Sequence, residues 1–142
     1  QGLNNEYYTS IEDNAINESK GLHILSPFDN LVIQRKRLME IFQFIYQIEC
    51  YVPAAKRKYG YYSMPIIYGN NFIARLDPKA DRKTGVFTVK SLWFEPDFNP
   101  DDAFFSIFAQ QLKSFSAFCG CNKVVLEFCN NRKYQKEIAK II

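Results

Sequence analysis

Residues 61–77 read YYSMPIIYGNNFIARLD, two runs rich in β-branched and aromatic residues that flank the dipeptide Gly69-Asn70. Gly and Asn together suit the tight turn of a β-hairpin, so this stretch predicts two antiparallel strands. Pro65 has no N–H to donate, which favours an edge position or a β-bulge in the first strand. Alternation then assigns the side chains of the second strand to opposite faces of a sheet. One face receives Phe72, Ala74 and Leu76, and the other receives Ile73, Arg75 and Asp77.

Further strands and helices are expected on both sides of this hairpin. Additional strands are predicted at residues 22–25, 44–52, 86–94 and 123–129. Helices are predicted at residues 34–43, from Pro100 to Gly120, and at 132–142. The last turn of the sheet is placed at Lys83-Thr84-Gly85, within a loop at residues 77–85. These elements predict an α+β domain, in which an antiparallel β-meander sheet has helices packed on one face.

The helix from Pro100 to Gly120 has the clearest local signals. Asn99 suits the N-cap, Pro100 suits the first helical position, and Asp101 and Asp102 suit the positive end of the helix. Apolar side chains follow at three- and four-residue spacings, which predicts a stripe facing the core. They are Phe104, Ile107, Phe108, Leu112, Phe115 and Phe118.

Length and composition indicate one folded domain. The chain has 142 residues, of which 47% are hydrophobic and 23% charged, so wholesale disorder is excluded. Residues 1–21 are polar and acidic and are expected to form a partly mobile leader, followed by a single domain at residues 22–142. The chain begins without Met or a signal peptide, which we interpret as the C-terminal domain of a longer protein.

Charge is unevenly distributed along the sequence. Residues 51–90 contain eight basic and two acidic residues, a net charge of +6, so the remainder of the chain carries −3. Tyr and Phe residues lie between these cations, a pattern that suits a polyanion such as nucleic acid. The alternative is an ordinary solvated face of the sheet. We expect the connection at residues 53–60 and the loop at 77–85 to form one positive surface.

Few residues suggest catalysis or metal binding. Asp77 and Asp81 lie among cations, which favours ionised carboxylates that organise the loop rather than a general acid or base. The four cysteines include Cys119-Gly120-Cys121 but no CxxC motif, and the single histidine, His23, is distant from them. We therefore expect reduced thiols, no metal, no cofactor and a cytoplasmic location.

Several ordered blocks resemble one enzyme family. They include Leu25-Ser26-Pro27-Phe28-Asp29-Asn30-Leu31, the segment from Tyr51 to Tyr62, and the segment from Arg75 to Lys83. Over residues 22–96 the sequence is similar to the winged-helix DNA glycosylases of the AlkZ/YcaQ type. The resemblance implies an enzyme of tandem winged helices that hydrolyses N-glycosidic bonds of alkylated or crosslinked DNA with an activated water.

In that family the catalytic motif is Gln-apolar-Gln or Gln-apolar-Asp, in the N-terminal part of the protein. Gln47-Ile48-Glu49 imitates it but aligns with the segment before the Tyr51-Val52-Pro53 block, so we assign it no catalysis. Glu49 is expected to pair with Lys56 or Arg57.

Two roles remain open for the domain. In the first, it supports DNA binding by the full-length protein and has no catalytic residue of its own. The expected nucleic-acid contacts are Lys56, Arg57, Lys58, Tyr59, Arg75, Lys79, Arg82 and Lys83. The expected structural residues are Asp29, Glu49, Asp77 and Asp81. In the second, the basic surface docks on a winged-helix lobe that precedes it and touches no DNA; a weaker third role is binding of RNA or a small molecule.

Overall fold

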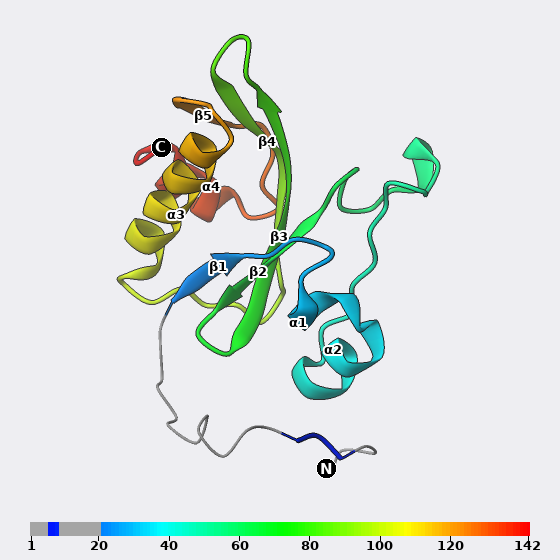
Figure 1. The fold of residues 1–142 in the computed structure, drawn as a ribbon. Coiled ribbons are helices and arrows are strands. Elements are labelled where there is room, and N and C mark those ends of the chain that lie inside the picture. The colour runs from blue at the N-terminus through cyan, green and yellow to red at the C-terminus, as the bar shows by residue number, and fades with distance from the viewer. Residues whose placement is uncertain (1–5, 9–20) are drawn as a thin grey trace.

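The computed structural model describes residues 6–8 and 21–142. A five-stranded sheet with the strand order β1-β2-β3-β4-β5 forms its centre (Figure 1). The strands are β1 (Leu22–Ile24), β2 (Met64–Tyr68), β3 (Asn71–Asp81), β4 (Val86–Phe94) and β5 (Lys123–Leu126). The helices are α1 (Asn30–Ile33), α2 (Arg35–Phe42), the 3-10 helix η2 (Ala54–Lys56), α3 (Phe104–Phe118) and α4 (Arg132–Ala139).

The predicted hairpin is confirmed as β2 and β3, which pair antiparallel across the turn at Gly69-Asn70. Gly69 has φ +58°, a conformation that glycine adopts without strain. β3 continues to Asp81, so the predicted loop at residues 77–85 is wrong in its first half. A register shift at Asp77/Pro78 lets the strand continue past the proline, and the chain turns only at residues 82–85.

A second register shift changes the faces assigned to β3. Ile66 pairs with Ala74 and Ile67 pairs with Phe72, so Ile73 is an extra residue without an opposite partner. Pro65 favoured an edge position or a bulge in the first strand. The edge position is wrong because β2 lies between β1 and β3, and the bulge has its extra residue in β3, opposite β2. Beyond the bulge, Phe72 packs on the opposite side from Ala74 and Leu76, against Phe44. The predicted shared face of these three residues is thus corrected.

The meander comprises β1 to β4, and β5 then pairs with β4 in parallel. The parallel pairing needs a crossover, which α3 supplies between the two strands. β5 ends at Leu126, earlier than the predicted strand, and Leu92 forms one further bridge to Cys129.

The strand predicted at residues 44–52 does not form. Phe44 and Tyr46 alternate with exposed Ile45 and Gln47, which explains the prediction, but the segment joins no ladder of the sheet. Its side chains supply the packing instead: the Tyr46 hydroxyl donates to the Ser63 carbonyl at 2.5 Å. Burial raises the pKa of Tyr46 to about 12.

α3 begins at Phe104, four residues later than predicted. A side-chain oxygen of Asp101, rather than Asn99, accepts the Phe104 N–H, at 3.0 Å. The helix ends as predicted, because Gly120 has φ +79° directly after the C-cap Cys119. Most of the apolar stripe faces the sheet, but Phe118 is 87% exposed and is not part of the core.

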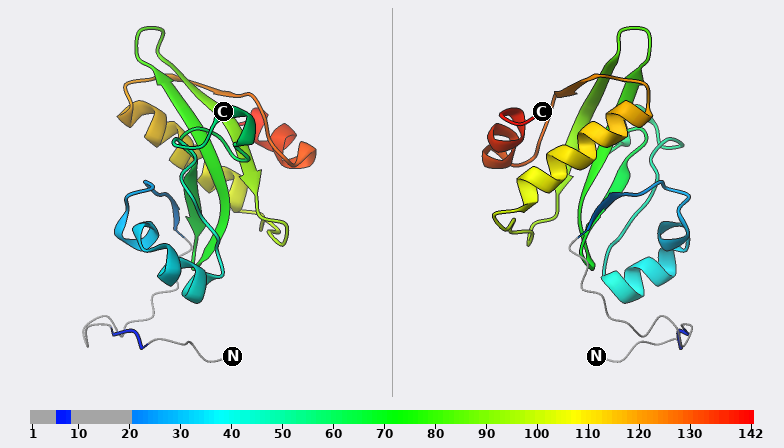
Figure 2. Two further views of the ribbon diagram at one scale, coloured as in Figure 1. Left: turned by 90° about the vertical axis from the view of Figure 1, so that its right-hand side faces the viewer. Right: turned by 60° about the vertical axis from the view of Figure 1, so that its left-hand side comes forward.

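Two apolar clusters lie on either side of the sheet. The larger one contains buried residues of α3 and α4 with Ile66, Leu76 and Leu92. The smaller one joins Val32 of α1 and Leu38 of α2 to Phe44, Tyr46, Ile67 and Phe72. Ile66 and Ile67 are neighbours on β2 and therefore face opposite sides. Accordingly, α3 crosses the sheet on one side while the chain around η2 runs across the other (Figure 2).

The predicted leader at residues 1–21 lies almost entirely outside the described residues. Within the part of the chain that the structure describes, no helix is long and apolar enough to span a membrane.

Replacement of Phe108 by alanine tests the main cluster. Its fully buried ring contacts those of Phe94 and Phe104, so Phe108→Ala should lower the free energy of unfolding by about 3–5 kcal/mol. The exposed Phe118 of the same helix supplies the control, and Phe118→Ala should change it by less than about 0.5 kcal/mol. Urea unfolding measures both, and equal losses would contradict the assigned helix faces.

Candidate nucleic-acid interface

Two buried carboxylates hold the backbone at residues 58–62. Oε1 of Glu49 accepts the Lys58 N–H at 3.0 Å, and Oε2 accepts those of Tyr59 and Gly60 at 2.7 and 3.0 Å. Asp77 accepts the next two, from Tyr61 at 2.9 Å and Tyr62 at 2.8 Å. Five consecutive N–H groups are thereby bound to two carboxylates.

This arrangement corrects the expected pairing of Glu49 with Lys56 or Arg57. Burial alone would raise the pKa of Glu49, but the N–H groups of Tyr59, Lys58 and Gly60 together lower it below its usual value. Gly60 has φ +136°, and a Cβ there would lie 2.3 Å from Oδ2 of Asp77. Only glycine allows the backbone to approach this closely.

Arg75 lies inside the protein and is only 4% exposed. Its guanidinium carbon lies 4.3 Å from the centre of the Phe44 ring and 4.1 Å from that of Tyr59. One nitrogen binds a Glu95 carboxylate oxygen at 2.6 Å, and the other donates to the Ile45 carbonyl at 3.2 Å. Although predicted as a phosphate contact, Arg75 is placed where it joins β3 to the segment at residues 44–59.

Arg57 is also engaged within the protein. Its Nε donates to the carbonyl of Val52 at 2.8 Å and to that of Glu49 at 3.2 Å. Its guanidinium lies over the Tyr61 ring, 4.9 Å from the centroid. These bonds close the turn before η2, while the half-buried side chain keeps part of its charge at the surface.

The remaining predicted cations are exposed. Lys56 ends η2, Lys58 lies over the Tyr59 ring, and Lys79 and Lys83 belong to β3 and its turn. Arg82 donates to the Cys119 carbonyl at 3.0 Å, next to the end of α3.

These cations form two groups rather than the single surface that we expected. Figure 1 shows η2 well apart from the turn between β3 and β4, which projects beyond the rest of the sheet. One group, which we call the η2 cations, comprises Lys56 and Lys58. The other, the hairpin cations, comprises Lys79, Arg82 and Lys83.

Asp29 and Asp81 stabilise local turns. A side-chain oxygen of Asp29 accepts the Leu31 N–H at 2.8 Å and caps α1. Asp81 accepts the N–H groups of Lys83 at 3.0 Å and Thr84 at 3.3 Å. Hydrogen bonds from Thr84 and Lys83 lower the pKa of Asp81.

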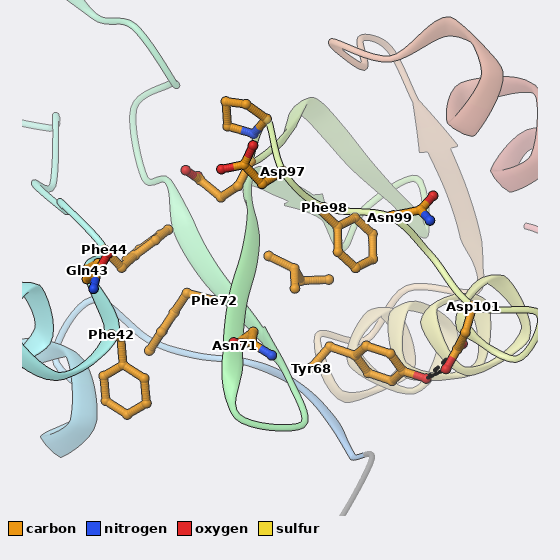
Figure 3. Close-up of a pocket in the computed structure, with 13 residues that line it drawn as sticks. Phe42, Gln43, Phe44, Tyr68, Asn71, Phe72, Asp97, Phe98, Asn99 and Asp101 are labelled. Carbon is orange, nitrogen blue, oxygen red and sulfur yellow. Dashed lines mark hydrogen bonds between the residues drawn. The ribbon is translucent and has the colours of Figure 1, made fainter.

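A groove of about 620 Å³ lies at the opposite end of β3 from the hairpin cations (Figure 3). Phe42, Phe44, Phe72 and Phe98 give it aromatic walls, and its carboxylates belong to Glu95, Asp97 and Asp101. The Tyr68 hydroxyl bonds to Asp101 at 3.1 Å. No Lys or Arg belongs to the residues that line the groove, so its charge disfavours phosphate. No sequence motif predicted this groove, because its walls come from three separate segments.

A metal centre has no support in the described ranges, where no group of three His, Cys, Asp or Glu side chains could hold an ion. All four cysteines are free thiols, and burial raises the pKa values of Cys119 and Cys129.

A family model of AlkZ-like DNA glycosylases matches residues 4–118, well over half of the chain. The chain belongs to this family. The match contains the hairpin, both carboxylates that bind residues 58–62, and both groups of cations. It ends at the last residue of α3, so β5 and α4 lie beyond it. No solved structure matches the chain.

Replacement of Glu49 by glutamine tests the binding of the backbone. An amide NH₂ in place of one oxygen would face N–H donors, so Glu49→Gln should lower the free energy of unfolding by about 2 kcal/mol or more. Urea unfolding at pH 7 measures the loss. Glu137→Gln removes an exposed carboxylate that pairs with Lys140, and this control should change stability by less than about 1 kcal/mol.

The same variant also tests how the stability contribution of Glu49 depends on pH. Because folding lowers the pKa of Glu49, its contribution is complete above its unfolded value of 4.5 and is lost as pH falls through the lower folded value. The difference in stability between the unmodified protein and Glu49→Gln should therefore shrink below about pH 4.5. A difference that stays constant down to pH 2 would contradict this role of the carboxylate.

Proposed function

We propose that this domain supports DNA binding in base-excision repair of alkylated or crosslinked DNA. The observation that carries the proposal is the family match, which spans both the η2 cations and the hairpin cations. The η2 cations and the hairpin cations would bind backbone phosphates without reading sequence. Arg75 is left out of this role, because its charge is already bound by Glu95.

The domain itself is proposed to carry no glycosylase chemistry. The family resemblance implies a Gln-apolar-Gln or Gln-apolar-Asp motif, and no such triplet occurs in these 142 residues. Both oxygens of Glu49 accept N–H groups, and its lowered pKa makes it a poor base for activating water. Catalysis by the parent protein would then depend on residues outside this chain.

The salt dependence of DNA affinity tests the phosphate contacts. We expect the double variant Lys79→Gln/Lys83→Gln to bind duplex DNA more weakly, and equally so for unrelated sequences. If both ammonium groups contact phosphates, the slope of log K against log salt should become shallower by about 2. Fluorescence anisotropy of a labelled duplex at several salt concentrations measures this slope.

Lys133→Gln/Lys136→Gln removes the same charge from exposed positions of α4 and is the matched control. Its slope should remain that of the unmodified chain. An unchanged slope for Lys79→Gln/Lys83→Gln, with lower stability, would instead favour docking of the hairpin cations on another lobe.

The catalytic assignment has its own test. The chain alone should release no 7-alkylguanine from alkylated DNA, because it lacks the motif that activates water. Chromatography of released bases measures this, with a no-protein incubation as the control. Release above that control would contradict the assignment.

A further inference from the structure

Three aromatic rings lie in a row on the sheet face away from α3. The Tyr59 and Trp93 ring centres are 5.8 Å apart, and those of Trp93 and Phe128 are 5.1 Å apart. Trp93 lies on β4 between Leu92 and Phe94, which are buried in the main cluster, so its side chain projects from the opposite face. The three residues come from the segment before β2, from β4 and from the segment after β5. We call them the aromatic row.

Tyr59 positions the row and leaves its other two members available. Its ring contacts the Arg75 guanidinium at 4.1 Å and the Lys58 ammonium at 4.8 Å, and its carbonyl accepts the Ser91 hydroxyl at 2.5 Å. Trp93 is half-buried, and Phe128 is 43% exposed. Within the described ranges the Trp93 indole forms no hydrogen bond, so its N–H is free to meet a ligand.

The charge around the aromatic row favours an anionic occupant. Lys58 extends from its Tyr59 end, and the segment from residue 51 to 90, which supplies Tyr59, carries a net charge of +6. Glu127, which precedes Phe128 in the chain, is paired with Lys90 at 2.8 Å. Aromatic faces beside cations suit nucleotides, whose bases pack on the rings while their phosphates pair with the cations.

We propose that the aromatic row binds unpaired nucleotides, with a base packed on Trp93 and Phe128 and its phosphate paired with Lys58. An unpaired strand is required because a duplex keeps both faces of each base stacked on its neighbours. This inference rests on the proposed function and adds the form of DNA that the domain recognises. The aromatic row is distinct from the hairpin cations, which lie at the end of β3 and in the turn that follows it.

The single tryptophan of the chain makes this face directly observable. The 142-residue chain is titrated with a 12-nucleotide oligothymidylate and with a 12-base-pair duplex, and Trp93 emission is recorded. We expect the single strand to quench the emission. Phe128→Ala should weaken its binding at least about fivefold, since a stacked base contributes strongly to affinity.

Two further variants separate stacking from folding. Phe128→Leu keeps the apolar bulk but removes the aromatic face, so it should also weaken single-strand binding while thermal unfolding remains close to that of the unmodified chain. Phe118→Ala removes an exposed ring outside the row, on α3, and should leave binding unchanged.

The outcomes distinguish this inference from the function on which it rests. If single strands leave Trp93 emission unchanged and both Phe128 variants bind like Phe118→Ala, the aromatic row binds no nucleotide. Salt-dependent duplex binding that is reduced in Lys79→Gln/Lys83→Gln would then still support the proposed function. If neither the single strand nor the duplex binds, both proposals are overturned.

Discussion

Binding of five consecutive N–H groups by Glu49 and Asp77 is the constraint that holds residues 58–62 against the sheet. Residues 58–62 form no part of a strand or helix, so their backbone groups need other partners if they are to lie against the sheet. Charged acceptors give the strongest bonds to such donors, and a single glycine allows the close approach to Asp77. Tyr59 consequently reaches both Arg75 and Trp93.

Positive charge in this domain therefore has two distinct uses. Arg75 is desolvated between two rings and paired with Glu95, where it holds the unpaired segment at residues 44–59 against β3. Lys56, Lys79 and Lys83 are exposed and form no ion pair within the described residues, so their charge is available to an anion. Because the buried Arg75 is already paired with Glu95, the count of basic residues overstates the positive charge that is available for binding.

The sequence predicted those elements whose signals are local. Gly69-Asn70 located the hairpin, and the apolar spacing and Gly120 located most of α3. The sequence-based assignment of side chains to the two faces of the sheet was wrong where strand pairing determines it. Ile73 is one extra residue in β3, and no local pattern distinguishes it from its neighbours. Similarly, residues 44–52 alternate like a strand, yet Glu49 binds the backbone of residues 58–60 instead of joining a ladder. The burial of Arg75 depends on rings 16 and 31 residues away in sequence, which composition cannot reveal.

The two ends of β3 differ in charge, so the domain has an acidic region at one end of this strand and a basic region at the other. The acidic groove adjoins Asn71, Phe72 and Ile73 at its start, and Lys79, the first of the hairpin cations, follows six residues after Ile73. At about 3.3 Å per residue the two regions are separated by roughly 20 Å, more than twice the screening length at physiological salt. In the proposed function each would therefore act on DNA independently: the groove would repel phosphates locally while the far end attracts them. Phosphates would then pair with the hairpin cations and not enter the groove.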